Sequence, residues 1–129
     1  MRSGTENVPG FAGLGLATKM VYEDLEARTV RMRAVKDRLT ERLKTLPDVY
    51  INEGEAPHIL SVSFVGVRSE VMLHALEERE IYVSSGSACS SNKPAVSHVL
   101  ASIGLPKDRL ESTIRFSFSA GNRQTMRQM

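Results

Sequence analysis

Cys89 is the only cysteine of the chain, and small residues surround it. It lies in residues 84–91, whose sequence is SSGSACSS. A buried structural cysteine is normally flanked by side chains that pack, whereas serine, glycine and alanine leave a thiol accessible on a loop. Lys93 and a helix predicted to begin near Pro94 would favour the nucleophilic thiolate. The sequence therefore predicts a reactive sulfur that reaches a partner; the alternative is an exposed cysteine without a role.

Arg115 is the second residue whose context suggests chemistry. It lies in residues 113–119, TIRFSFS, where apolar and polar side chains alternate as in a half-buried strand. A strand keeps a guanidinium group in place, and the planar fork can then hold a carboxylate in a bidentate geometry. The alternative is an arginine on the open face of a sheet, and these residues alone slightly favour it.

Three histidines, His58, His74 and His98, complete the set of reactive side chains. Together with Cys89 they could in principle bind zinc, but their spacing matches neither paired Cys-x-x-Cys nor His-x-x-x-His. We therefore expect no metal site and a structural or surface role for each histidine. His98 is the candidate base for a Cys-His dyad, although nothing in the sequence indicates that it approaches Cys89.

Apolar periodicity predicts the elements that must position these residues. Apolar residues three or four apart over residues 12–46 predict one long helix, whose basic middle we interpret as a solvated face rather than an anion-binding surface. Short strands are predicted at 49–51 and 81–83, and a longer one at 58–65. Ser69 is the predicted N-cap of a helix.

A second short helix is predicted after Cys89. Pro94 suits its first turn, Gly104 and Pro106 suit its end, and its inner face is predicted to be Val96, Val99, Leu100 and Ile103. Strands and helices of these lengths predict an α/β fold, a two-layer sandwich in which helices cover one face of a small sheet. Residues 1–10 are a predicted leading loop, 11–119 the domain, and 120–129 a polar tail expected to be frayed or disordered.

Composition narrows the class of protein further. A chain of 129 residues with one cysteine cannot form an internal disulfide, and no apolar run approaches the roughly 20 residues that span a bilayer. The formal charge is only +2, aromatic residues make up 5%, and tryptophan is missing, which disfavours nucleic-acid binding. We therefore expect a cytoplasmic protein that binds neither membrane nor nucleic acid.

Several segments resemble one enzyme family. Residues 84–91 (SSGSACSS), 97–100 (SHVL), 103–106 (IGLP) and 112–117 (STIRFS) resemble the C-terminal part of a pyridoxal-phosphate-dependent cysteine desulfurase. Residues 2–7 (RSGTEN) are similar to the segment by which that family enters its small domain. The resemblance covers residues 2 to about 119 and implies the small domain of a class V aminotransferase-like, fold-type I enzyme.

The resemblance implies a role for three residues. Cys89 would attack the sulfur of L-cysteine bound to the cofactor, leaving L-alanine and a persulfide on Cys89. Arg115 would hold the substrate carboxylate, and Thr5 would reach the cofactor phosphate of the neighbouring subunit in a homodimer. The implied partners are a sulfur-acceptor or scaffold protein, and the implied product is sulfur for iron-sulfur cluster assembly.

The chain also departs from the family pattern. The large domain that would supply the Schiff-base lysine is missing, and none of the five lysines, Lys19, Lys36, Lys44, Lys93 and Lys107, stands in that context. Residues 121–126 (GNRQTM) replace the closing helix. We therefore expect a fragment or one piece of a split enzyme, with an incomplete cofactor site. The alternatives are a persulfide-accepting or partner-binding module and an inactive remnant; apolar surface left exposed by the missing domain predicts self-association.

Overall fold

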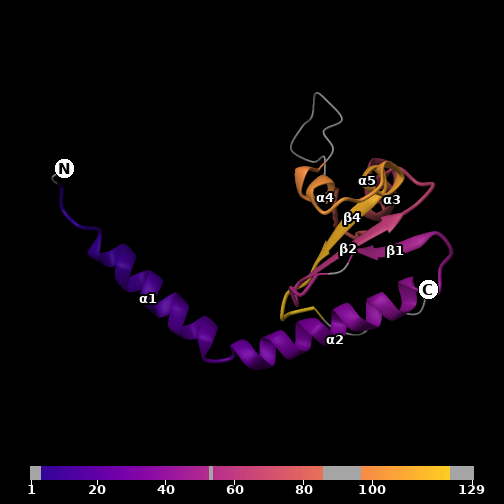
Figure 1. The fold of residues 1–129 in the computed structure, drawn as a ribbon. Coiled ribbons are helices and arrows are strands. Elements are labelled where there is room, and N and C mark those ends of the chain that lie inside the picture. Colours follow the sequence, from indigo (N-terminus) through magenta and orange to yellow (C-terminus); the bar gives the residue numbers. More distant parts are fainter. Residues whose placement is uncertain (1–3, 53, 86–96, 123–129) are drawn as a thin grey trace.

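The computed structural model describes residues 4–52, 54–85 and 97–122. Within these residues the chain forms a four-stranded sheet in the order β1-β2-β4-β3 (Figure 1). The strands are β1 (Val49–Asn52), β2 (Ile59–Phe64), β3 (Ser84–Ser85) and β4 (Thr113–Ser117), and every neighbouring pair is antiparallel. The predicted strands at 49–51, 58–65 and 113–119 are confirmed with small changes at their ends.

The register separates the side chains of the sheet into an apolar and a polar face. Val62 on β2 pairs with Ile51 on β1 and Ile114 on β4, so these three side chains project to the same side. Leu60, Val62 and Ile114 are at most 1% exposed and form the core. The opposite face is polar and carries Asn52, Ser61, Ser63, Thr113 and Arg115.

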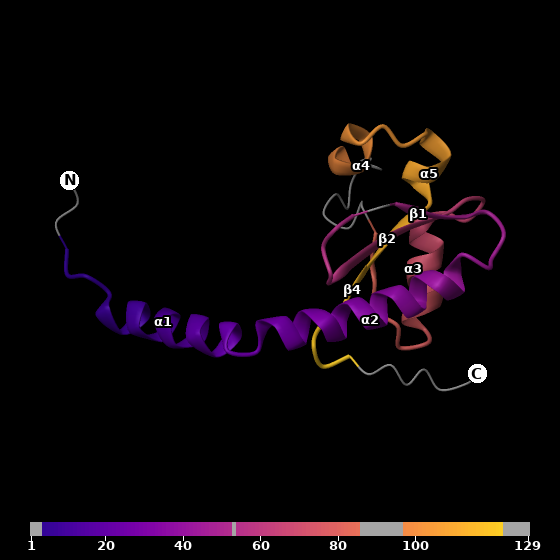
Figure 2. The ribbon, with the colours of Figure 1, turned by 60° about the horizontal axis from the view of Figure 1, so that its bottom comes forward.

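Two long helices cover the apolar face. Helices α2 (Leu25–Leu43) and α3 (Ser69–Glu77) lie on one side of the sheet in Figure 2 and contact β2 and β4, respectively. The predicted two-layer α/β fold is therefore confirmed. The short helices α4 (His98–Ser102) and α5 (Lys107–Glu111) lie on the other side, where they partly cover the polar face.

The prediction of one long helix over residues 12–46 is wrong. The structure has α1 (Val8–Tyr22) and α2, separated at Glu23 and Asp24 because Asp24 leaves the helical conformation (φ −128°, ψ 20°). The Asp24 carboxylate instead binds Arg31 at 2.8 Å from the beginning of α2, where negative charge is favourable. Helix α1 also begins inside the predicted leading loop, because the Asn7 side chain caps Gly10 N–H and proline is tolerated in the first turn.

Two further predictions are corrected. Ser69 is the first residue of α3 and not its N-cap, which is Arg68, and Ser69 is buried. No strand forms at residues 81–83; the chain meets β4 only at Ser84 and Ser85, which pair with Arg115 and Ile114. The position of β3 depends on where β4 lies, which no local sequence pattern determines.

The predicted inner face of the helix before Gly104 is correct for only one described residue. Leu100 is buried, whereas Val99 is 71% exposed and Ile103 57% exposed, because α4 has only five residues and presents little more than one turn to the sheet. Gly104 ends this helix with φ +75°, as its position predicted. Pro94, Val96 and the tail residues 123–129 lie outside the described residues.

Helix α1 has no tertiary partner for its apolar side chains among the described residues. All its residues are exposed, including Phe11 and Leu14, although its composition is strongly apolar. Figure 1 shows α1 extending away from the sheet and meeting α2 at a bend. An apolar helix of this length is marginal in water without packing. Helix α1 therefore presents a surface that another body must cover.

We expect the chain to self-associate through α1. Replacing Phe11 and Leu14 together with glutamate should lower the sedimentation coefficient at equal protein concentration, because it removes exposed apolar area and adds repelling charges. Val30→Glu, which changes an exposed valine on α2, is the control and should leave association unchanged. A single monomeric species for the unchanged chain would contradict the expectation.

The core should be sensitive at Ile114. Ile114→Ala should lower the free energy of unfolding by about 2 to 5 kcal/mol, because the side chain is fully buried and its removal leaves a cavity. Val71→Ala on the exposed side of α3 should cost about 0.5 kcal/mol or less. Urea unfolding followed by circular dichroism measures both; equal costs would contradict the assigned core.

Candidate functional site

Arg115 projects from the polar face of the sheet between two serine-bearing strands. On β4 it pairs with Ser61 of β2 on one side and with Ser84 of β3 on the other. Its Nη2 donates to the Ser84 hydroxyl at 3.4 Å, and it forms no ion pair with any described residue. The exposed guanidinium is therefore oriented by the strand and can bind an added carboxylate.

A cleft of about 660 Å³ surrounds Arg115. Helix α4 forms one wall, where Leu100 is buried and Ile103 lines the cleft. The sheet forms the floor with small polar side chains. From the sheet these are Ser61, Ser84, Ser85, Thr113 and Asn52. A cleft with one guanidinium group and several hydroxyl groups suits a small polar anion.

A closed ring of hydrogen bonds holds this floor. Arg109 Nη2 donates to Asn52 Oδ1, and Asn52 Nδ2 donates to the Ser63 hydroxyl at 3.1 Å. Thr113 Oγ1 gives its only proton to the Arg109 carbonyl, so the 2.7 Å contact between the two hydroxyl groups is a bond from Ser63 to Thr113. The ring begins and ends at Arg109 and joins β1, β2, β4 and α5.

Sequence reasoning missed this ring, although part of its pattern is visible. Ser61 and Ser63 alternate with apolar residues along β2, and Asn52 is a polar residue at the end of β1. This alternation indicated a polar face, but Arg109 lies 57 positions from Asn52, and Thr113 lies 50 positions from Ser63. Only the folded chain shows that these polar groups satisfy one another.

Cys89 lies in residues 86–96, outside the described residues, as do Lys93 and Pro94. The described residues on either side of that segment are Ser85, at the end of β3, and Ser97, whose side chain caps α4. Both line the cleft that contains Arg115.

Thr5, the third predicted site residue, is not brought near Arg115. It is exposed and precedes α1, and the beginning of α1 is the end that points away from the sheet (Figure 1). The predicted contact of Thr5 with a neighbouring subunit stays a prediction.

The histidines lie apart from one another on the surface. His58, His74 and His98 are all exposed, and His74 Nδ1 lies 3.4 Å from the Glu77 carboxylate. In the part of the chain that the structure describes, no three residues of metal-ligating type come together. His98 is the first residue of α4, and its relation to Cys89 stays untested. None of the described helices has the length and apolar character needed to cross a membrane.

Comparison with known proteins points to one family. The sequence profile of the aminotransferase class-V family matches residues 1–126. The chain is similar to the cysteine desulfurase IscS of Klebsiella pneumoniae strain 342, with 41% identity over 120 residues that cover 91% of this chain and 29% of that protein. The protein of the same name from Methanosarcina thermophila is 35% identical over 124 residues, covering 94% and 31%.

Solved structures of similar fold agree with the sequence matches. The NifS-like protein from Rickettsia africae superimposes with a TM-score of 0.77 at 29% identity, covering 95% of this chain and 32% of that one. DndA from Streptomyces lividans gives a TM-score of 0.61 at 28% identity, covering 92% and 33%. The chain thus spans less than a third of the length of each of these four proteins.

The hydrogen-bonded ring should contribute measurably to stability. Ser63→Ala should lower the free energy of unfolding by about 1 to 3 kcal/mol, because it removes the hydrogen bond that the buried Thr113 oxygen accepts and leaves one Asn52 proton without its partner. Ser117→Ala, at an exposed position of β4, is the matched control and should change it by about 0.5 kcal/mol or less. Equal unfolding midpoints in urea would contradict the ring.

Proposed function

The chain belongs to the aminotransferase class-V family, and from this membership we propose that it is the small domain of a cysteine desulfurase. The observation that carries the proposal is the cleft on the polar face. It contains a strand-held arginine without a carboxylate partner among the described residues, and its lining includes Ser85 and Ser97, the described neighbours of the segment that bears Cys89. Names of the relatives at 35 to 41% identity support the same activity.

In the proposed reaction Arg115 holds the carboxylate of L-cysteine. Its guanidinium is already oriented by Ser84 and by the pairing of β4 with both neighbouring strands, so binding requires little rearrangement. The Cys89 thiolate then forms a sulfur-sulfur bond with the substrate while the carbon-sulfur bond of the substrate breaks. The electron pair of that bond stays on carbon, which takes up a proton, and the products are L-alanine and a persulfide on Cys89.

The family uses pyridoxal phosphate, held by a Schiff-base lysine, as an electron sink for such chemistry. None of the described lysines is placed for that role. No lysine lines the Arg115 cleft. Lys19 and Lys107 pair with glutamates one turn away, and Lys36 donates to the carbonyls of Gly54 and Ala56. We therefore assign the cofactor to a large domain beyond this sequence, with Thr5 proposed to reach its phosphate from a neighbouring subunit of a homodimer.

Helix α1 supports the proposal that this domain works together with a larger body. An apolar helix that is exposed along its whole length needs a covering surface, and the relatives have more than two thirds of their length outside the matched region. The assembled enzyme would be cytoplasmic and would pass sulfur from Cys89 to an acceptor or scaffold protein for iron-sulfur cluster assembly. The alternatives are a persulfide-accepting module and an inactive remnant.

A fusion tests the proposal directly. We expect no sulfide from the unchanged chain with L-cysteine, pyridoxal phosphate and a thiol reductant, because no described lysine lines the cleft. Joining the chain to the large domain of the Klebsiella pneumoniae cysteine desulfurase should restore sulfide release. Cys89→Ser should abolish it, and Arg115→Gln should lower kcat/KM by about a hundredfold, since it removes a charged bidentate contact.

Arg38→Gln, an exposed arginine of α2, is the matched control for charge and should leave kcat/KM unchanged. A fusion that releases sulfide equally well with Cys89→Ser would overturn the assignment of Cys89. A chain that gains a persulfide on Cys89 by mass spectrometry from an intact desulfurase, while its fusion stays inactive, would favour the persulfide-accepting module.

A further inference from the structure

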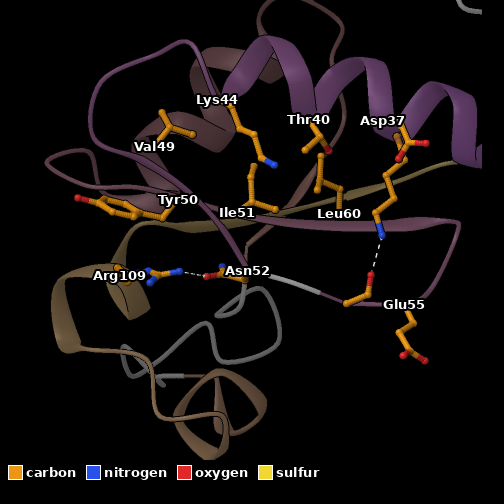
Figure 3. A pocket seen from close by; sticks show the side chains of 12 residues that line it. Asp37, Thr40, Lys44, Val49, Tyr50, Ile51, Asn52, Glu55, Leu60 and Arg109 are labelled. Atoms are coloured by element: carbon orange, nitrogen blue, oxygen red, sulfur yellow. Dashed lines mark hydrogen bonds between the residues drawn. The ribbon is translucent and has the colours of Figure 1, made fainter.

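A second cleft, of about 610 Å³, follows the free edge of the sheet and plays no part in the proposed reaction. Strand β1 pairs only with β2, so its other side is open in the described part of the chain. Helix α2 lines one side of this edge with Lys36, Thr40 and Lys44, and Arg109 of α5 lines the other (Figure 3). The cleft therefore lies along a strand edge that has no partner among the described residues.

The hydrogen bonds of the sheet show which groups of β1 face the opening. Phe64 N–H donates to Ser112 on the β4 side, and Val65 N–H donates to Asp48. In an antiparallel ladder the bonded pairs alternate, so the backbone groups of Tyr50 and Asn52 point to β2. The N–H and C=O groups of Val49 and Ile51 consequently point outward, where no described residue pairs with them.

The cleft carries positive charge at one end. In Figure 3, Arg109 lies beside Tyr50 and Lys44 lies over Ile51, whereas Asp37 and Glu55 lie at the end away from Tyr50, together with Lys36, which donates to backbone carbonyls there. The Lys44 ammonium group forms no ion pair or hydrogen bond within the described ranges. The Arg109 guanidinium lies 5.0 Å from the Tyr50 ring centroid and binds Asn52, while its Nε is buried and has no hydrogen-bond partner among the described residues. A buried N–H without an acceptor is uncommon and costs free energy.

We propose that the open edge of β1 binds an extended acidic segment of a partner protein as an added strand. The outward N–H and C=O groups of Val49 and Ile51 form the main-chain hydrogen bonds. Two adjacent side chains of an extended segment point to opposite faces, so neighbouring carboxylates reach Lys44 on the α2 side and Arg109 on the α5 side. Asp37 and Glu55 outnumber Lys36 at the far end and set the direction, because the net negative charge there repels acidic residues.

This inference does not depend on the sulfur chemistry, since none of the residues involved lines the Arg115 cleft except Asn52, which holds Arg109. A cysteine desulfurase and a stand-alone module would both use the same edge. Failure of the sulfide assay would therefore not contradict peptide binding at β1. Failure of the peptide to bind would likewise not contradict the proposed desulfurase activity.

The test uses the full chain and a short synthetic peptide of alternating valine and threonine with two adjacent glutamates at its centre. Fluorescence anisotropy should show binding that is about tenfold weaker for the peptide with glutamines in place of the glutamates. Lys44→Gln and Arg109→Gln should each reduce this preference for glutamate. Arg38→Gln, on the opposite face of α2, should preserve it.

Amide hydrogen exchange separates strand addition from simple attraction of charge. The bound peptide should slow exchange of the Val49 and Ile51 amides about tenfold or more and leave the already bonded amides of Tyr50 and Asn52 nearly unchanged. Arg109→Gln opens the hydrogen-bonded ring and could unfold the domain. In that case the preference for glutamate is tested with Lys44→Gln alone. Absence of binding, or binding without protection of Val49 and Ile51, would overturn the proposal.

Discussion

The antiparallel register between β2 and β4 is the constraint on which the rest of the structure depends. Because Val62 pairs with Ile114 and Ser63 with Thr113, apolar side chains gather on one face of the sheet and polar side chains on the other. A shift by one residue would exchange the two faces. The same pairing places the fully buried core under α2 and α3 and leaves the opposite face free for Arg115 and its cleft.

A polar face beside an apolar core needs its buried groups satisfied, and the ring through Arg109, Asn52, Ser63 and Thr113 does this. Each hydroxyl or amide in the ring both donates and accepts, so Ser63 and Thr113 can be almost completely buried without losing a bond. The ring also connects the two clefts. It forms part of the floor beside Arg115, and through Arg109 it shapes the edge of β1.

Three surfaces of the domain carry groups that the described residues leave without partners. Helix α1 exposes apolar side chains, Arg115 has no carboxylate, and the outward backbone of β1 has no neighbouring strand. Each surface calls for a different chemistry: burial of apolar area, binding of an anion, and main-chain hydrogen bonding. Their separation in space is consistent with a domain that functions inside a larger assembly, as the length of its relatives suggests.

The sequence by itself determined β1, β2 and β4, the fold class and the residue types of the candidate site. Alternation along residues 58–65 and 113–119 is a local property, and so is the small-residue context of Cys89 and the helix stop at Gly104. Only the tertiary structure decided that Ser84 lies beside Arg115, that α1 and α2 separate at Asp24, and that β1 is left at the edge. The physical reason is the distance along the chain between interacting residues. A local pattern determines which face of a strand a side chain occupies, whereas the residue that it contacts comes from a distant segment. Ser63 and Thr113, for example, are fifty positions apart.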